Sequence, residues 1–316
     1  MKAAVIDMGT NTFHLMIVEI NGGDFTVLYK EKAAVRLGKG GINKGLITED
    51  AWERAISTLI RFTKVIEDHE AAEIFATATS AVRNAGNGQE LVDAIKATTG
   101  IDTRIISGLE EASYIYYGVQ KALDIGDEPA LIMDIGGGSI EFIIANMTEV
   151  YWLESFEIGG QRMMEIHHQN DPITDHEIKN LEEYLSSNLI RLFEAVEKFK
   201  PTTLIGSSGT FDTLSEIYQN KTGTSVGAEA TEFPFTIAAF KDIFQDLVVK
   251  SRKERLDIAG MIPLRVDMIV VASVLINFII KSFDIQSIRV SAYALKEGVL
   301  LKTVDSLTSH KSINTD

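Results

Sequence analysis

The chain has 316 residues, carries a formal net charge of −15 and contains no cysteine. This length suits two domains, each with a core of its own. The absence of cysteine excludes a disulfide framework and a cysteine-based metal site. The acidic charge argues against a nucleic-acid partner, because such proteins usually carry a basic stripe. A polyanionic ligand would need local positive partners: backbone N–H groups, a few arginines and a bound cation.

Two stretches bear on the location of the protein. Residues 1–9 hold no extended apolar run, so we expect no secretory signal. Residues 268–280 form the longest apolar run, but it is too short to span a bilayer. We interpret it as a buried core helix. We therefore expect a cytoplasmic protein with no membrane partner, and the lack of cysteine fits a reducing compartment.

The first part of the chain predicts three strands followed by alternating helices and strands. The predicted elements are strands at 3–6, 13–20 and 25–35, a helix at 47–68, a strand at 73–78, a helix at 89–99, a strand at 103–106 and a helix at 108–122. Asn21-Gly22-Gly23 is typical of a hairpin turn, and Thr48 is a suitable N-cap. This order predicts a mixed α/β layer.

The pattern then restarts. The predicted elements are strands at 130–133, 140–145 and 150–156, a long helix at 174–198 capped by Thr174, a strand at 203–205, a helix from about 209, a strand at 288–290 and a helix at 294–303. When the two beginnings are aligned, Asp7 matches Asp134 and Thr12 matches Ser139. We interpret this agreement as an internal duplication at domain scale.

Each aligned loop joins an acidic strand end to glycines and hydroxyl residues. Glycine lets the backbone turn sharply and lets its N–H groups approach a ligand closely. A carboxylate beside such donors suits a phosphate with Mg²⁺, because Mg²⁺ prefers oxygen ligands. Taken singly, each loop is equally consistent with an ordinary turn. Two such loops facing each other favour a phosphate site. Glu141 aligns with His14, so the two loops are not equivalent.

Several segments resemble one family in their order along nearly the whole chain. They are Ala4-Val5-Ile6-Asp7-Met8-Gly9-Thr10-Asn11-Thr12-Phe13-His14, Ala76-Thr77-Ala78-Thr79-Ser80-Ala81-Val82-Arg83, Ile106-Ser107-Gly108-Leu109-Glu110-Glu111-Ala112, Asp134-Ile135-Gly136-Gly137-Gly138-Ser139-Ile140-Glu141, Gly206-Ser207-Ser208-Gly209-Thr210, Pro263-Leu264-Arg265-Val266-Asp267, and Ser291 with Glu297-Gly298-Val299-Leu300. In these segments the sequence resembles the exopolyphosphatase and guanosine pentaphosphate phosphatase family.

The resemblance implies an α/β fold of two tandem ribonuclease-H-like domains, of the type found in actin, heat-shock chaperones and sugar kinases. Each domain would hold a mixed five-stranded sheet flanked by helices, with the active site in the interdomain cleft. We expect the domains at 1–123 and 124–297, and a C-terminal helix at about 298–316 that packs back on the first. A homodimer is implied by the resemblance alone.

The resemblance also implies residue roles. Glu111 would be the general base, with Asp134 and Glu141 as the other catalytic carboxylates. Glu110 competes with Glu111, because neighbouring side chains on a helix point about 100° apart and only one can face the site. Asp7, Asp134 and Glu141 form the expected metal set, for Mg²⁺ or alternatively Mn²⁺.

The expected phosphate-binding set is larger. It comprises Thr10, Asn11, Thr12, Arg83, Gly136, Gly137, Gly138, Ser139, Ser208, Gly209 and Arg265. Arg83 is the best candidate for a bidentate phosphate contact, whereas Arg265 is equally consistent with a surface arginine. Residues 36–41 could form a mobile basic flap or an ordinary glycine-rich turn. Lys296 stands where many family members have arginine, which puts a phosphate role there in question.

The implied reaction is hydrolysis of a terminal phosphoanhydride by water attacking in line. The first hypothesis is an exopolyphosphatase that releases orthophosphate from polyphosphate. The alternative is a guanosine pentaphosphate 5′-phosphohydrolase, and remoter ones are a non-hydrolytic alarmone or phosphate sensor and an actin-like or kinase ATPase. Because no long basic channel is evident, we expect a preference for short substrates or poor processivity.

Overall fold

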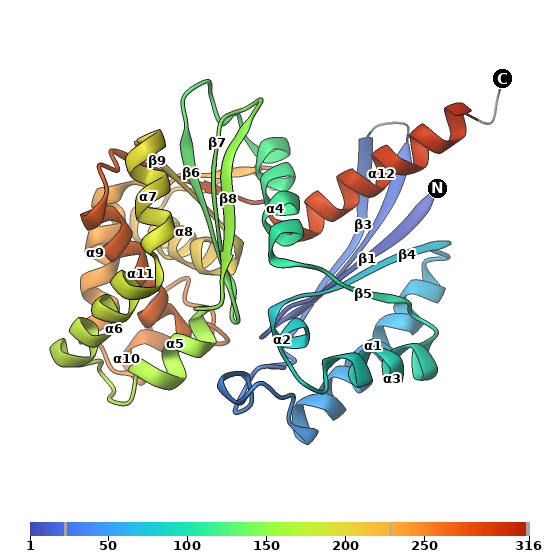
Figure 1. Ribbon diagram of the computed structural model, residues 1–316, viewed down its shortest axis with the longest axis horizontal. Helices are drawn as coiled ribbons and strands as arrows, with labels where there is room; N and C mark the ends of the chain where they lie inside the picture. Colours follow the sequence, from blue (N-terminus) through green and yellow to red (C-terminus); the bar gives the residue numbers. More distant parts are fainter. Residues whose placement is uncertain (22–23, 228, 314–316) are drawn as a thin grey trace. The chain divides into compact units, whose positions relative to one another are not determined.

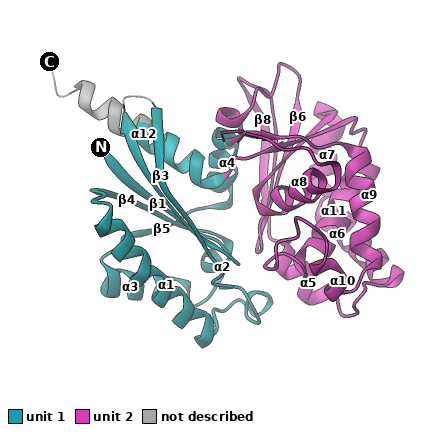
Figure 2. Ribbon diagram, turned by 180° about the vertical axis from the view of Figure 1, so that it is seen from behind, with its two compact units in different colours: residues 1–118, 295–316 teal, residues 119–294 magenta. Residues whose placement is uncertain are grey.

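The computed structural model describes residues 1–21, 24–227 and 229–313, with side chains up to residue 304. The chain divides into two compact units (Figure 2). Unit 1 comprises Met1–Gly118 with Leu295–Asp316, and unit 2 comprises Val119–Ala294. The domain boundaries predicted from the sequence, 1–123 and 124–297, lie near these limits.

Unit 1 is built on a mixed five-stranded sheet of order β3-β2-β1-β4-β5. The strands are β1 (Lys2–Met8), β2 (Phe13–Asn21), β3 (Asp24–Ala33), β4 (Glu73–Ala78) and β5 (Thr103–Ile105). The first three strands form an antiparallel meander, and β4 runs parallel to β1. Gly22 and Gly23 of the predicted hairpin turn lie outside the described residues.

Helices lie on both sides of this sheet (Figure 1). They are η1 (Ile42–Lys44), α1 (Glu49–Asp68), α2 (Ser80–Arg83), α3 (Gly88–Thr99), α4 (Gly108–Ala122) and α12 (Leu295–Ile313). Alternation along β1 places Ile6 and Met8 in a core cluster with Leu59 of α1 and Leu91 of α3. Helix α12 returns from the end of the chain and contacts β1 and β2.

Unit 2 repeats the arrangement around a six-stranded sheet of order β10-β11-β9-β6-β7-β8. The strands are β6 (Ala130–Ile135), β7 (Ile140–Ala145), β8 (Val150–Phe156), β9 (Thr203–Ser207), β10 (Glu232–Phe233) and β11 (Ser287–Ser291). The antiparallel meander β6-β7-β8, with β9 parallel to β6, matches β1-β2-β3 with β4. The short β10 adds a sixth strand beyond the five that were predicted.

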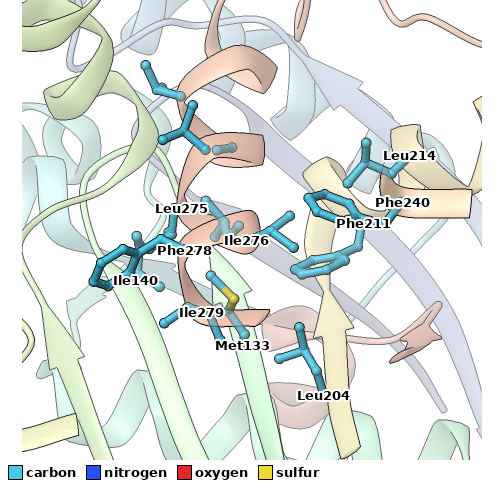
Figure 3. Close-up of a cluster of buried hydrophobic side chains, with 14 of the residues drawn as sticks. Met133, Ile140, Leu204, Phe211, Leu214, Phe240, Leu275, Ile276, Phe278 and Ile279 are labelled. Carbon is cyan, nitrogen blue, oxygen red and sulfur yellow. The ribbon is translucent and has the colours of Figure 1, made fainter. Parts of the chain in front are cut away.

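The helices of unit 2 surround one large core. They are α5 (Gly160–His167), α6 (Asp175–Asn188), α7 (Ile190–Phe199), α8 (Ser208–Thr222), α9 (Ile237–Val249), α10 (Arg252–Leu256) and α11 (Met268–Ser282). Figure 3 shows Ile276 of α11 beside Phe211 of α8, and Ile279 of α11 beside Met133 of β6. Residues 268–279 are all buried, which confirms the predicted core helix. Among the described residues, no helix is both long and apolar enough to cross a membrane.

The prediction of one helix over residues 174–198 is wrong. The chain forms α6 and α7, which are separated at Leu189. Leu185, Leu189 and Leu192 are all fully buried, so the apolar period continues across the break and conceals it in the sequence. Thr174 is the predicted N-cap and forms a full capping box with Glu177.

Candidate functional site

The strand register confirms the alignment of the two loops. Asp7 at the end of β1 pairs with His14 of β2, and Asp134 near the end of β6 pairs with Glu141 of β7. The parallel neighbours also match, because Asp7 pairs with Thr77 and Asp134 with Ser207. The two sites therefore share one backbone framework and differ in the residue opposite the aspartate.

The carbonyl groups of the second loop are held by a neighbouring segment. The backbone N–H groups of Gly159 and Gln161 donate to the carbonyls of Gly138 and Gly137 at 3.1 and 2.8 Å. Gly160 donates to Gly136 at 2.9 Å. This contact needs glycine at position 159, since a Cβ there would lie 2.5 Å from the loop backbone. The start of α5 therefore fixes the loop.

The first loop is held in the same way. The N–H of Arg36 donates to the carbonyl of Asn11 at 2.8 Å, and Gly38 donates to Thr10 at 2.9 Å. Arg36 and Gly38 thus correspond to Gly159 and Gln161. Because Leu37 between them is fully buried, the first part of the segment 36–41 is an integral support of the loop.

These hydrogen bonds orient the N–H groups that remain. In a trans peptide the C=O of one residue and the N–H of the next point in opposite directions. With the carbonyls of Gly136, Gly137 and Gly138 directed toward α5, the N–H groups of Gly137, Gly138 and Ser139 point the other way. The N–H groups of Asn11 and Thr12 are oriented likewise. Each loop therefore has successive N–H groups that are able to bind an anion.

The Asp134 carboxylate is buried and hydrogen-bonded. Asp134 is only 5% exposed, and Ser207 Oγ donates a hydrogen bond to its Oδ2 at 2.7 Å. Burial raises the pKa of Asp134 to about 6, and hydrogen bonds from Ser207 and Ser208 oppose the rise. Asp212 raises this pKa further, and Arg265 lowers it. Removal from water is thus the largest influence on the pKa of this carboxyl group.

Glu141 gives the site its second carboxylate. It is 1% exposed, and Ser155 Oγ donates to its Oε1 at 2.6 Å. Residues directly opposed in antiparallel strands project from the same face, so Asp134 and Glu141 are close neighbours. Two buried carboxylates with hydroxyl donors on one oxygen fit a hard cation such as Mg²⁺. Among the described residues, no group of three or more acidic, histidine or cysteine side chains is arranged as a metal site.

Arg265 lies near Asp134 of this carboxylate pair. A Cβ at Gly209 would lie 1.9 Å from its Nη2, so the guanidinium rests directly on the backbone of Gly209. Burial lowers the pKa of Arg265, while Asp212 and then Asp134 oppose that shift. These contacts are not those of a surface arginine. Ser208 precedes Gly209 with φ 72°, a left-handed conformation that costs a non-glycine residue free energy and often marks a functional site.

Unit 1 brings the predicted base and the best phosphate ligand together. Arg83 Nη1 contacts Glu111 Oε2 at 2.8 Å and the carbonyl of Ile106 at 3.1 Å. Glu111 is buried, whereas Glu110 is partly exposed. Glu110 accepts from the N–H of Ser107 at 2.9 Å and pairs with Arg104, so it caps α4. Of the two glutamates, Glu111 is the one in an enclosed position.

The remaining predicted residues of unit 1 lie at its loop. Thr10 and Thr12 are buried, and Thr12 Oγ1 has no hydrogen-bond partner in the part of the chain that the structure describes. Asp7 and Asn11 are partly exposed. Of the expected metal set, Asp7 belongs to unit 1, while Asp134 and Glu141 belong to unit 2.

Sequence reasoning missed four contributors: Ser155, Ser207, Asp212 and the segment 159–161. Ser207 could have been found from the sequence. It lies at the end of β9, as Thr77 lies near the end of β4, so extending the internal alignment to these strands would have included it. No sequence pattern indicated Ser155 or Asp212. Ser155 comes close to the site through strand pairing, and Asp212 does so through the position of the start of α8.

The raised pKa of Asp134 predicts a stability change on substitution by asparagine. Below pH about 4 the carboxyl group is protonated in both states, and from there to about pH 6 only the folded protein keeps the proton. Above pH 6 the folded protein bears the full cost of a buried charge. Asp134→Asn should therefore stabilise the chain by up to about 3 kcal/mol at alkaline pH, with no gain at acid pH. Thermal unfolding in a chelator measures this, and a pH-independent difference would contradict it.

The contact between Gly209 and Arg265 predicts that a substitution at Gly209 weakens phosphate binding but leaves the stability of the fold almost unchanged. In Gly209→Ala the new Cβ displaces the guanidinium, which is the mobile end of a long side chain. We expect affinity for inorganic phosphate to fall about tenfold, the loss of one charge-assisted contact, with little change in unfolding temperature. In Gly209→Ala combined with Arg265→Ala, phosphate titration should show no loss beyond that of Arg265→Ala alone. Additive losses would show that Gly209 acts independently of Arg265.

Comparisons with known proteins agree with this geometry. A crystal structure of an exopolyphosphatase from Cytophaga hutchinsonii superposes with a TM-score of 0.94 at 45% identity, covering 97% of this chain and 98% of that one. Exopolyphosphatase 1 of Mycobacterium leprae is 26% identical over 97% of this chain and 90% of its own length. A guanosine-5′-triphosphate,3′-diphosphate pyrophosphatase of Vibrio atlanticus is 28% identical over 96% of this chain and 59% of its own length.

The family-level comparison covers almost the whole chain. The model of the Ppx/GppA phosphatase family matches residues 16–307. That range includes Arg83, Glu111 and the second loop, and the similar solved structures confirm the predicted two-domain α/β fold. The chain belongs to the Ppx/GppA phosphatase family.

Proposed function

We propose that the protein is an exopolyphosphatase, which hydrolyses the terminal phosphoanhydride of inorganic polyphosphate and releases orthophosphate. Membership of the phosphatase family supports hydrolysis, and similar proteins named exopolyphosphatase support the substrate. The observation that carries the proposal is the enclosed Glu111–Arg83 pair at 2.8 Å. It places a carboxylate that can accept a proton from water beside a fork that can bind a phosphate.

Each residue of unit 1 has a distinct task in this reaction. The N–H groups of Asn11 and Thr12 bind oxygens of the terminal phosphate. Arg83 binds a further oxygen and holds Glu111 in orientation through their ion pair. Glu111 takes a proton from the attacking water, while the bond between the terminal phosphorus and its bridging oxygen breaks. Catalysis of this kind rests mainly on positioning and on stabilising charge at the phosphate.

Unit 2 contributes a second loop and the acidic pair. The N–H groups of Gly137, Gly138 and Ser139 bind phosphate oxygens, and Arg265 adds a positive charge. Asp134 and Glu141 would hold Mg²⁺ or Mn²⁺, as their burial and hydroxyl donors support. The third predicted ligand, Asp7, stays a prediction from the sequence. When bound, the cation would neutralise negative charge on the phosphates.

The alternative substrate is guanosine pentaphosphate. It presents the same kind of terminal phosphoanhydride, and the Vibrio atlanticus relative carries the name of that activity. This chain spans only 59% of that relative's length. The proposed cytoplasmic location, the homodimer and the lack of a nucleic-acid partner stay predictions from the sequence.

Replacing the proposed base tests the mechanism. Glu111→Gln keeps an acceptor for Arg83 but cannot take a proton at neutral pH. We expect kcat to fall by about 10²–10⁴-fold, the usual contribution of a general base, with polyphosphate affinity changed little. Glu110→Gln is the matched control and should retain most activity, since Glu110 serves the helix cap. Retained activity in Glu111→Gln would refute the assignment of the base.

A panel of substrates tests the function itself. Orthophosphate release should be fastest from polyphosphate, slower from guanosine pentaphosphate and slowest from ATP, with Mg²⁺ present in each case. A higher kcat/KM on guanosine pentaphosphate would select the alternative. Tight polyphosphate binding by the parent protein with no release of phosphate would indicate a sensor.

A further inference from the structure

Arg162 of α5 contacts the second loop through its side chain. Its Nε donates to the carbonyl oxygen of Gly138 at 2.8 Å. The same oxygen accepts the backbone N–H of Gly159 at 3.1 Å. A carbonyl oxygen has two lone pairs and can accept both bonds. One peptide of the loop is therefore held by a neutral donor and by a charged one, and a charged donor forms the stronger hydrogen bond.

The guanidinium is held in this position by its surroundings. Arg162 lies in the first turn of α5, where a side chain leans back toward the segment that precedes the helix. Only 13% of its side chain is exposed, and its Nη2 lies 3.4 Å from Oε2 of Glu157 in that segment. The contact with Gly138 is therefore a fixed part of unit 2 and differs from that of a freely moving surface arginine.

The effect of this contact passes through the Gly138–Ser139 peptide. The C=O of Gly138 and the N–H of Ser139 belong to one planar unit and point in opposite directions. A cation at the oxygen draws electron density from the nitrogen through the amide resonance. The Ser139 N–H then becomes a stronger donor, as hydrogen bonds in a chain strengthen one another by roughly 10–30% per bond. The Nε contact thus acts on an anion through the peptide, from its opposite side.

The first loop differs at the equivalent position. Its supporting segment aligns with that of the second loop, and the alignment pairs Gly38 with Gln161. The residues that follow are Lys39 and Arg162. Lys39 is exposed, whereas the side chain of Arg162 is largely enclosed. Both segments have a basic residue at this position, but the second loop has its cation fixed against a loop carbonyl.

We propose that Arg162 is a positioning residue of the second loop, which strengthens phosphate binding by polarising the Gly138–Ser139 peptide. The inference rests on the proposed function for the anion, which is an oxygen of a substrate phosphate bound by the Ser139 N–H. It deepens that function by assigning a part in phosphate binding to a residue that acts through the backbone. Holding the loop needs only a donor at the position of Nε, whereas polarising the peptide needs the charge.

Two substitutions separate the donor from the charge. Arg162→Gln keeps a neutral N–H donor at the reach of Nε, and Arg162→Met keeps that length without a donor. NMR titration with inorganic phosphate in the presence of a chelator follows the amide of Ser139, so it reports on the second loop alone. We expect the phosphate Kd to rise about three- to fivefold in Arg162→Gln and about tenfold in Arg162→Met.

The amide resonances separate polarisation from a purely structural role. Without phosphate, the amide nitrogen of Ser139 should shift upfield in Arg162→Gln and farther in Arg162→Met, because its shielding follows hydrogen bonding at the carbonyl of its own peptide. The amides of Gly137 and Gly138 should shift less. Arg191→Gln is the matched control, since it removes an exposed arginine of α7 that pairs with Glu154 of β8. It should leave the phosphate Kd and the Ser139 resonance at parent values.

The outcomes separate the role of Arg162 from the proposed function. A phosphate Kd at the parent value in Arg162→Gln would overturn the proposal, whatever the behaviour of Arg162→Met. Equal shifts of all three loop amides would also overturn it, because Arg162 would then only maintain the loop. If the graded effects are found but the parent protein releases no phosphate from polyphosphate, the proposed function fails and the role of Arg162 stands.

Discussion

The chemistry of this chain depends on backbone hydrogen bonds that hold the carbonyl groups of two short loops. The start of α5 binds the carbonyls of Gly136, Gly137 and Gly138, and the segment after β3 binds those of Thr10 and Asn11. Because the peptide unit is planar, the N–H group that follows each of these carbonyls must point in the opposite direction. These N–H groups are fixed in the absence of a ligand, so an anion bound there would cost little further conformational entropy.

The two loops share one backbone arrangement but have different side chains around it. At the equivalent strand position, unit 1 has His14 and unit 2 has Glu141, and the hydroxyl beside the aspartate comes from Thr77 or Ser207. Beside its loop, unit 2 has two buried carboxylates, Asp134 and Glu141, whereas unit 1 holds the enclosed Glu111–Arg83 pair. Duplication thus supplied two loops with one backbone plan, and divergence gave unit 2 the buried carboxylate pair and unit 1 the enclosed ion pair.

Much of the fold and of the candidate site was accessible from the sequence, because the duplication repeats local patterns. Asp134, Glu141 and the glycines lie within one short motif, and the strand register confirms their alignment. What was missed depends on contacts between distant segments. Ser155 reaches Glu141 only through the pairing of β7 with β8, and Gly159 reaches the loop only after a turn. The break at Leu189 was hidden because buried leucines continue on both sides of it.

Unit 1 is discontinuous in sequence, since it is completed by residues that follow all of unit 2. Helix α12 comes so close to α4 that a Cβ at Gly298 would lie 1.7 Å from the carbonyl oxygen of Tyr114. During synthesis, the sheet carrying the first loop therefore emerges long before the helix that covers its second face. Unit 1 is thus the first unit to be translated and the last to be completed. Until α12 is made, Val5 and Met16 lack the cover that this helix gives to β1 and β2.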